Sequence, residues 1–389
     1  MIVNQKKKFK VLTICSWYPN KTNPTLGNFV QKHSDTIALY NHAAALSIFP
    51  SDSIHSVQLQ EVKRNDLNEI IVYYPRIKNG FKPLRLLQNF ISHRKAFKKG
   101  YQRTLELIGK PDVVHLNIVY PLGIWALWLK LRHKIPYVVS ENSSGFHVES
   151  EHAYPPHILR LCKLVLRHAS VLLPVSKNLK SNLERLVVKK RFEIICNVVD
   201  ENLFSYSEMA SKNPNKLIHI STGIDSIKNI SGMVRVVNQL YIEYPDLHLD
   251  IVSDGDLNYA EDLHKSLGSN TCIDFYSTKT TVEIAQMIGA SDALLMFSNY
   301  ENFPCVIAEA MMSGKPVISS NVNGIPEHVH SDYGILVEPQ DEQQLTNAIY
   351  SFLVGERIFE PNKIRAYAME HFSYAAVGKK FTEVYQSLK

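Results

Sequence analysis

Cysteine is scarce in this sequence of 389 residues, which has only five. No two of them have the C-x-x-C spacing or the spacing of zinc ligands; they are Cys15, Cys162, Cys196, Cys272 and Cys305. An odd number of widely spaced cysteines in apolar stretches is typical of buried, reduced thiols. The sequence therefore predicts neither a disulfide framework nor metal or redox chemistry at cysteine.

Long apolar segments are also missing. No stretch of about 18 apolar residues occurs, since even Tyr120–Leu131 is broken by Lys130. The N-terminal residues are rich in lysine, but the apolar run that follows, Val11–Cys15, is too brief for a signal-peptide core. We expect a cytoplasmic protein that is neither exported by that route nor membrane-spanning. No short repeat or low-complexity tract is visible, which disfavours a solenoid.

Charge is present in both signs but unevenly distributed. The chain has 43 Lys+Arg and 37 Asp+Glu, for a net charge of +6. Residues 1–205 hold 30 of the basic and 14 of the acidic residues, a net of +16, whereas residues 206–389 hold 13 and 23, a net of −10. A basic half suits an anionic partner such as a membrane surface, and no recognised nucleic-acid motif accompanies it.

Short β-branched runs alternate with longer helical patterns, as in parallel βαβ units. The predicted strands of the first half are Lys10–Cys15, Ala43–Phe49, Ile70–Tyr74, Val113–Leu116, Tyr137–Ser140, Val171–Val175 and Phe192–Cys196. Those of the second half are Leu217–Ser221, Leu247–Val252, Cys272–Phe275, Ala293–Phe297, Val317–Ser319 and Ile335–Val337. Each half is a candidate doubly wound α/β domain.

The domain boundary is predicted in the polar segment Ser205–Asn215, which ends in Asn-Pro-Asn. We expect a first domain at residues 1–205 and a second at residues 206–373. Two such domains would place the carboxyl ends of both sheets around one cleft, where ligands of α/β sheets bind.

The segment after the predicted strand Ala293–Phe297 carries the strongest chemical signal. Pro304 suits the first residue of a helix, because its missing N–H costs nothing there. The amides of Cys305 and Val306 would then lie at a helix N-terminus, where the helix dipole favours a phosphate.

Two glutamates flank this turn. Glu309 lies on the same helix face as Cys305 and Val306 and about one turn further on, within reach of the ribose of a bound nucleotide. Glu301 precedes the helix, where a sugar attached to the phosphates would lie. The alternative is a pair of solvated carboxylates that only stabilise the start of the helix.

Six motifs in the correct order resemble those of the family 4 glycosyltransferases. Glu301-Asn-Phe-Pro-Cys-Val-Ile-Ala-Glu309 is similar to the family's pair of glutamates separated by seven residues. The other five are Asp112-Val-Val-His115, Val175-Ser176, Asn197-Val-Val-Asp200 with Phe204, Gly324-Ile-Pro-Glu327 and Leu336-Val-Glu-Pro339. The resemblance covers the chain from end to end and implies the GT-B arrangement, in which two Rossmann-like domains face a central cleft. It also implies that the C-terminal helix, residues 374–389, crosses back to the first domain.

The resemblance assigns roles to residues of the second half. It implies that Glu309 binds the nucleotide ribose, Glu301 the donor sugar and Lys228 the diphosphate. The nucleotide sugar would also contact the turn that joins the two glutamates, namely Asn302, Phe303, Pro304, Cys305 and Val306. The family usually has an arginine five residues before the lysine, and here that position is Gly223.

Candidate residues in the first half rest on the same resemblance. Gly27 and Asn28 occupy the place of the family's glycine-containing loop, where glycine lets backbone approach a diphosphate or acceptor. Asn142 stands where many members have a histidine beside the donor sugar. An asparagine can donate a hydrogen bond there but cannot act as an acid or base.

Three further polar residues are weaker candidates in the first half. His147 can replace the missing histidine or be an ordinary solvated loop residue. Asn117 and Tyr120 follow a predicted strand and are candidates for the acceptor side.

A basic, apolar segment at residues 81–103 mixes seven Lys/Arg with Phe and Leu. As a helix, it would align Leu84, Leu87 and Ile91, together with Leu86, Phe90 and Phe97, in an apolar stripe beside basic residues, which suits an anionic membrane. The alternative is an amphipathic helix that packs on its own domain.

Together these features predict a retaining glycosyltransferase that moves a sugar from a nucleotide diphosphate to a saccharide or a polyprenyl-diphosphate-linked acceptor. We expect it to act in cell-surface polysaccharide or lipopolysaccharide synthesis, as a cytoplasmic or peripheral membrane protein. No metal or other cofactor is expected, because Asp254-Gly-Asp256, although it has the spacing of a D-x-D motif, lies beside a strand and is predicted to be a turn. The alternatives are a nucleotide-sugar epimerase or sugar phosphorylase, or a catalytically silent saccharide-binding protein, on the same fold.

Overall fold

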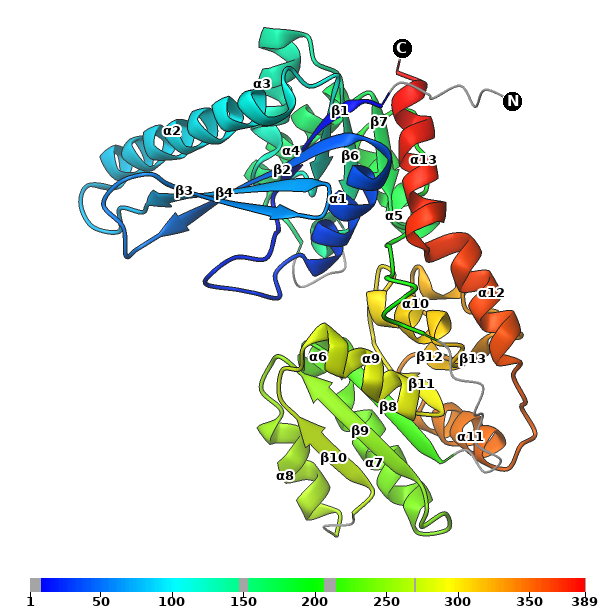
Figure 1. The fold of residues 1–389 in the computed structure, drawn as a ribbon. Coiled ribbons are helices and arrows are strands. Elements are labelled where there is room, and N and C mark those ends of the chain that lie inside the picture. The colour runs from blue at the N-terminus through cyan, green and yellow to red at the C-terminus, as the bar shows by residue number, and fades with distance from the viewer. Residues whose placement is uncertain (1–7, 147–152, 206–214, 269–270, 389) are drawn as a thin grey trace, which may run out of the picture. The chain divides into compact units, whose positions relative to one another are not determined.

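The computed structural model describes residues 8–146, 153–205, 215–268 and 271–388 (Figure 1). The chain forms two compact units. The first comprises the chain up to Val175 together with Leu179–Ile195 and the residues from Val377 onward, and the second comprises Ser176–Asn178 and Cys196–Ala376. Most of the predicted boundary, Ser205–Asn215, lies outside the described residues.

The first unit is built on a seven-stranded sheet in the order β3-β4-β2-β1-β5-β6-β7. All neighbours pair in parallel except β3 and β4, which are antiparallel. The strands are β1 (Lys10–Cys15), β2 (His42–Ser51), β3 (Gln58–Arg64), β4 (Leu67–Pro75), β5 (Val113–Asn117), β6 (Tyr137–Glu141) and β7 (Val171–Pro174). Its helices are α1 (Asn28–Tyr40), α2 (Lys82–Ile108), α3 (Gly123–His133), α4 (Pro156–His168) and α5 (Lys177–Leu186), of which α5 has its first two residues in the second unit.

The strand predicted at Phe192–Cys196 does not form, and that prediction was wrong. The segment lies beside β7, where the Leu172 amide donates to the Arg191 carbonyl and the Leu172 carbonyl accepts from the Glu193 amide, but only the bridge between Leu172 and Phe192 is made. The next donor of a parallel ladder would be residue 174, which is proline and has no N–H. The ladder therefore stops after one pair. Strand β3 was not predicted, because this edge strand is mostly exposed and polar.

The second unit contains a six-stranded, fully parallel sheet in the order β10-β9-β8-β11-β12-β13. The strands are β8 (Lys216–Ser221), β9 (His248–Ser253), β10 (Ile273–Tyr276), β11 (Ala293–Met296), β12 (Val317–Ser320) and β13 (Gly334–Val337). The helices are α6 (Asp225–Lys228), α7 (Ile230–Tyr241), α8 (Asn258–Ser266), α9 (Thr281–Ala290), α10 (Cys305–Met312), α11 (Glu342–Leu353) and α12 (Pro361–Phe372). The predicted class, two Rossmann-like α/β domains, is confirmed.

Strand order reverses once in each sheet, between β1 and β5 in the first and between β8 and β11 in the second. At such a point the loops after adjacent strands diverge to opposite faces and leave room for a ligand at the carboxyl ends. The loops that begin at Ser16 and Ile118 in the first unit, and at Thr222 and Phe297 in the second, are therefore the expected locations of a ligand site.

The last helix, α13 (Tyr374–Gln386), contributes to the core of the first unit from residue 377 onward. Phe381 is fully buried there, and its ring meets those of His33 and His115 edge to face. The buried Tyr385 hydroxyl lies 2.5 Å from His115 Nδ1. The first unit is thus completed by residues from the far end of the sequence. Among the described residues, none of the helices combines the length and apolar character required to cross a bilayer.

Candidate functional site

Lys228 is presented by a short helix that follows the central strand β8. Helix α6 begins three residues after β8 and ends at Lys228, because Asn229 adopts the left-handed conformation with φ of 49°. Asparagine tolerates that conformation better than most residues. Its side chain also accepts a hydrogen bond from the Gly232 amide and so caps α7. The conformation of Asn229 therefore fixes the end of α6 and with it the position of Lys228.

Glu301 is presented by the turn after the neighbouring strand β11. The turn is anchored on one side because the Asn299 amide donates to the Ile227 carbonyl at 2.8 Å. On the other side, the Glu301 amide donates to Asn323 Oδ1 at 3.1 Å. Gly324 is necessary here, since a Cβ at that position would lie 2.0 Å from the Asn302 carbonyl oxygen.

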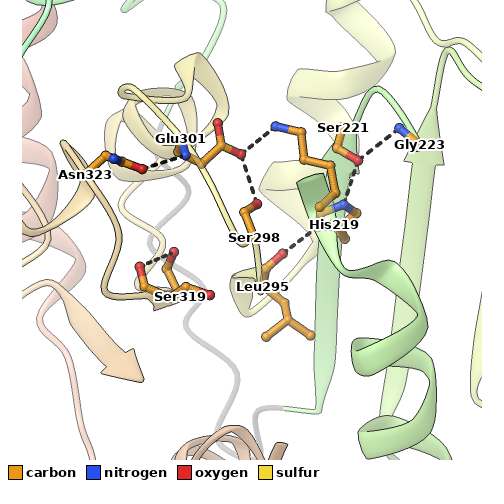
Figure 2. Close-up of polar contacts among 10 residues, drawn as sticks. His219, Ser221, Gly223, Leu295, Ser298, Glu301, Ser319 and Asn323 are labelled. Carbon is orange, nitrogen blue, oxygen red and sulfur yellow. Dashed lines mark hydrogen bonds and ion pairs between the residues drawn. The ribbon is translucent and has the colours of Figure 1, made fainter. Parts of the chain in front are cut away.

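Lys228 and Glu301 meet directly at the carboxyl edge of the sheet (Figure 2). Lys228 Nζ lies 2.5 Å from Glu301 Oε1, and the side chains are only 13% and 9% exposed. Ser298 Oγ donates to the same oxygen at 2.9 Å. The second carboxylate oxygen and the remaining ammonium protons are left to bind a polar ligand such as a sugar or a phosphate.

A neutral histidine supports this edge from below. His219 Nδ1 lies 2.9 Å from the Leu295 carbonyl oxygen, to which it must donate, and Nε2 lies 2.8 Å from Ser221 Oγ. Burial lowers the pKa of His219 to about 4. The ring is therefore neutral at pH 7 and Nε2 accepts from the serine, which in turn accepts from the Gly223 amide (Figure 2). This series of hydrogen bonds links β8 to β11, and no sequence motif predicted a role for His219.

Gly223 has a structural reason to be glycine. Its φ is 74°, and a Cβ would lie 2.5 Å from Ser253 Oγ. Its carbonyl accepts a hydrogen bond from the Tyr259 hydroxyl at 2.9 Å. The loop conformation thus requires glycine at this position, which explains why the expected arginine is absent.

Helix α10 begins one residue later than predicted. Pro304 is its N-cap, with φ of −64° and ψ of 132°, and Cys305 is the first helical residue. The correction is small because proline suits either position before the first intrahelical donor. Val306 is buried and Cys305 is partly exposed, and Glu309 follows one turn later, also partly exposed.

The side chain of Phe303 points into the core rather than outward. Its ring packs on His328 and Phe372, with centroids 4.5 Å and 5.4 Å away. Its carbonyl accepts from Asn197 Nδ2 at 3.3 Å. Phe303 therefore holds the turn in place, while the neighbouring Asn302 is partly exposed.

In the first unit, Gly27 caps α1 in a conformation that other residues avoid. It has φ of 66°, and a Cβ would lie 2.6 Å from the carbonyl carbon of Trp17. Asn28 is the first helical residue and is exposed. The loop after β1 thus passes closely over the start of α1, and this contact with Trp17 requires glycine at position 27.

Asn142 lies beside a buried carboxylate that sequence reasoning missed. Glu141 is 1% exposed, and its carboxylate accepts backbone hydrogen bonds from Val119 at 2.9 Å, Asn142 at 3.1 Å and Ser143 at 2.8 Å. Burial raises the pKa of Glu141 to about 7, although the three amides oppose the rise. One side chain therefore organises the loops after both β5 and β6. His147 lies outside the described residues.

The other acceptor-side candidates are less accessible than predicted. Asn117 is 1% exposed, and its Oδ1 faces His33 Nδ1 at 3.3 Å. Such burial removes it from direct contact with a ligand, so that prediction was wrong. Tyr120 is partly exposed and its ring meets that of Tyr154 edge to face.

Among the described residues, the group with metal-ligand geometry is His248, Asp250 and Asp274. It lies toward the amino ends of β9 and β10, whereas Lys228 and Glu301 follow the carboxyl ends of their strands. Lys216 already pairs with Asp250 at 3.0 Å. The segment Asp254–Asp256 lies in the bend between β9 and α8, where the Asn258 amide donates to Asp256.

Two family models match most of the chain. The one described as Glycosyltransferase Family 4 matches residues 55–203, and the one described as Glycosyl transferases group 1 matches residues 206–371. The chain is also 25% identical over 289 residues to N-acetyl-alpha-D-glucosaminyl L-malate synthase of Bacillus anthracis, a match that covers 70% of this chain and 74% of the relative.

Solved structures share the fold over the full length. HepE of Anabaena, in complex with UDP, has a TM-score of 0.73 and 18% identity, with 97% of this chain and 100% of that chain covered. The apo form of the lipopolysaccharide outer core galactosyltransferase WaaB has a TM-score of 0.68 and 16% identity, with 98% and 100% covered. At these identities the likeness establishes the fold.

Proposed function

The chain belongs to the family 4 glycosyltransferases, retaining enzymes of the GT-B fold that use nucleotide sugars, and we propose a donor site, an acceptor class and a mechanism for it. The observation that carries the proposal is the Lys228–Glu301 pair at the strand-order reversal of the second sheet, beside the N-terminus of α10.

Lys228 and the first turn of α10 would bind the diphosphate of the donor. The lysine supplies a full positive charge in a place that is only 13% exposed, and a helix N-terminus adds its partial charge. Both favour the negative charge that grows on the leaving diphosphate as the sugar departs. This arrangement compensates in part for the arginine that Gly223 replaces.

Glu301 and Glu309 would bind the two ends of the nucleotide sugar. Glu301 is held by Lys228 and Ser298, which fixes its carboxylate where it accepts from hydroxyls of the donor sugar. Glu309 lies one turn along α10, where it would accept from the ribose hydroxyls. We propose UDP as the first nucleotide to test, since the structural relative HepE binds UDP.

The acceptor proposed is a saccharide or a polyprenyl-diphosphate-linked glycan of cell-surface polysaccharide or lipopolysaccharide synthesis. Support comes from the basic first half of the chain and from the fold shared with WaaB. Asn142 and the loop that begins at Gly27 would lie on this side, with Asn142 donating a hydrogen bond to a sugar oxygen.

The proposed mechanism is front-face transfer. The bond from the anomeric carbon to the diphosphate oxygen breaks, the acceptor hydroxyl oxygen bonds to the same face, and the departing phosphate takes the hydroxyl proton. The protein contributes mainly by positioning the reactants and by stabilising the diphosphate. No step of this scheme requires a protein nucleophile or a metal ion.

Thermal-shift screening of the full chain against UDP-, GDP- and ADP-sugars tests the donor site. We expect one nucleotide to stabilise the protein, and Lys228→Gln to abolish most of that stabilisation. Lys279→Gln is the matched control, because Lys279 also pairs with a glutamate in the second unit but lies next to α9. If no nucleotide stabilises the wild type, or if Lys228→Gln behaves like the control, the donor site is wrong and a catalytically silent protein is favoured.

Glu301→Gln separates nucleotide binding from transfer. The variant keeps the shape of the side chain and loses its charge, so the nucleotide should still bind while transfer falls about 10²- to 10³-fold, as for the loss of one key polar group. Release of free epimer, or turnover that requires phosphate and no acceptor, would instead identify an epimerase or a phosphorylase.

A further inference from the structure

The N-terminal half of α2 exposes an unusual run of large apolar side chains. Six of them lie within eleven residues, and their exposed fractions run from 42% to 75%: Phe81, Leu84, Leu86, Leu87, Phe90 and Ile91. Single exposed apolar residues are normal on a protein surface, but a contiguous group indicates a contact surface. Figure 1 shows α2 as one continuous helix, of which Phe81 is the N-cap and the other five residues lie in the first turns.

The C-terminal half of α2 shows which face packs on the domain. There Phe97, Gly100, Tyr101 and Thr104 are buried at helical spacing, and the Phe97 ring stacks on Trp125 at 4.4 Å. This half accounts for the attachment of the helix to the sheet. In the N-terminal half, the Phe90 ring also stacks on Trp125, with centroids 6.4 Å apart, so Phe90 belongs to the packed side of the helix.

Three of the exposed apolar residues lie on the face turned away from the domain. Side chains two residues apart on a helix point in directions that differ by about 200°. Lys95 therefore points away from the side of the buried Phe97, and Lys98 away from the side of the buried Gly100. Leu84 lies eleven residues before Lys95 and Leu87 eleven before Lys98, about three turns in each case, and Ile91 lies seven before Lys98, about two turns. One outward face therefore changes from apolar to basic along its length. A helix that only packed on its own domain would have its apolar residues on the inward face and polar residues on the outward face.

The charge of the helix has one sign. Between Phe81 and Leu105 there are seven Lys/Arg and no Asp/Glu. Of these seven, only Arg103 forms an ion pair with a carboxylate of the described residues, and it lies at the packed end. The cations next to the apolar turns, Arg94, Lys95 and Lys98, are therefore uncompensated within the described chain.

We propose that this face of α2, formed by Leu84, Leu87 and Ile91 with Arg94, Lys95 and Lys98, docks on an anionic lipid bilayer. The apolar side chains would enter the region between headgroups and acyl chains, while the cations remain at the level of the lipid phosphates. The inference rests on the proposed function only in that a lipid-linked acceptor would lie in the same membrane.

Other occupants fit the charges less well. A second copy of the chain docked on this face would place Arg94, Lys95 and Lys98 against the same cations, and like charges across an interface oppose association. A nucleic acid would neutralise the basic residues but leave the leucines in water. An anionic bilayer is the partner that satisfies both halves of the face.

Co-sedimentation of the full chain with vesicles tests the proposal. We expect binding to vesicles of phosphatidylcholine mixed with phosphatidylglycerol and little binding to phosphatidylcholine alone. Leu87→Asp/Ile91→Asp should lower the bound fraction at least about tenfold, since it puts charge in place of buried apolar area on an anionic surface. Each Lys or Arg replaced by Gln in the basic turns should lower the partition coefficient about fivefold, the equivalent of the contribution of one surface cation.

Ile242→Asp/Ile358→Asp is the matched control, because these isoleucines are 79% and 86% exposed on the second unit and the charge change is identical. The control should bind vesicles like the wild type, and both double variants should keep the wild-type melting temperature. Equal losses in both variants, or no binding of the wild type to anionic vesicles, would overturn the proposal. A concentration-dependent dimer that Leu87→Asp/Ile91→Asp abolishes would overturn it in favour of self-association.

Nucleotide stabilisation in the thermal-shift assay keeps the two proposals apart. Leu87→Asp/Ile91→Asp should respond to the donor nucleotide as the wild type does, because none of the proposed donor residues lies on α2. Loss of vesicle binding with intact nucleotide binding concerns the membrane face alone, whereas vesicle binding without any nucleotide response refutes only the donor site.

Discussion

Three backbone amides converge on one buried carboxylate, that of Glu141, and this single residue shapes two loops of the first unit. Opposing effects act on its proton. Burial disfavours the charged form, while the amides favour it. Burial prevails and raises the pKa to about 7, in surroundings that include the hydroxyl of Tyr154 and the thiol of Cys162.

A pH-dependent contribution to stability follows from Glu141. Its pKa is 4.5 without these effects and about 7 in the fold, so the folded state holds more protons between these values. This contribution is fully present below about pH 4.5 and is lost as the pH rises through 7, by up to about 3 kcal/mol. Glu141→Gln stays neutral at every pH. We expect the stability difference between the variant and the wild type to shift in favour of the variant from pH 5 to pH 8, as measured by urea denaturation.

Comparing Glu141→Gln with the wild type cancels the contribution of the histidines to stability, which changes with pH in the opposite direction. Burial lowers the pKa of His33 and His219 to about 4, so they cost stability as the pH falls below 6.5 in the wild type and the variant alike. A difference that shifts in favour of the wild type from pH 5 to pH 8 would mean that the amides outweigh burial.

Gly223 gives a second prediction at the scale of one residue. Gly223→Arg would restore the cation common in the family, but its backbone has φ of 74° and its Cβ would meet Ser253 Oγ. We expect a loss of about 1–2 kcal/mol from the left-handed backbone alone, and no gain in nucleotide affinity. Gly289→Ala in α9 is the control in the same unit, since its Cβ meets nothing within 4 Å. It should raise stability by about 0.5–1 kcal/mol. Tighter nucleotide binding by a stable Gly223→Arg would contradict this account of the loop.

At the scale of elements, helix α2 combines two functions in one segment. The buried residues of α2 all lie from Ala96 onward, whereas most residues before it are exposed and a few, such as Asn89 and His93, are partly buried. Most helical stability in proteins comes from packing rather than propensity, so the two halves should differ in their opening.

Amide hydrogen exchange measures that difference directly. We expect the amides of residues 85–94 to exchange faster than those of residues 97–108 in solution, and to become protected on anionic vesicles. The amides of α7, whose buried residues span its length, provide an internal reference within the second unit. Uniform protection along α2 without vesicles would show that the contacts of the outer turns hold them as firmly as packing holds the inner turns.

At the scale of the whole molecule, the chain returns to its first unit at its end. The segment from Val377 adds Phe381 and Tyr385 to a core that includes His115, which lies 270 residues before Tyr385. The stability of the first unit therefore depends on residues that follow the entire second unit.

Phe381→Ala should destabilise the first unit by about 3–5 kcal/mol, the usual cost of removing a fully buried phenylalanine. Lys379→Ala on the same helix is the control, because that side chain is exposed. Differential scanning calorimetry should show one lowered transition and leave the nucleotide-dependent transition of the second unit in place. A simultaneous fall of both transitions would show that the two units unfold together.

Much of this protein is determined by its local sequence. The alternation of apolar strands and amphipathic helices was enough to predict two doubly wound sheets, because hydrophobic periodicity is a local signal. The turn from Glu301 to Glu309 was readable for the same reason, since a strand, a proline and a helix start follow one another along the chain.

The pairings between distant segments were decided only by the tertiary structure. Lys228 and Glu301 are 73 residues apart, and their direct contact depends on β8 and β11 being neighbours in the sheet. Neither the burial of Asn117 nor the convergence of amides on Glu141 can be predicted from the local sequence pattern. The spacing of its apolar residues was enough to predict an apolar face on α2. Whether that face contacts the domain or the solvent depends on where the sheet ends. Periodicity records which residues share a face, and only packing determines what that face meets.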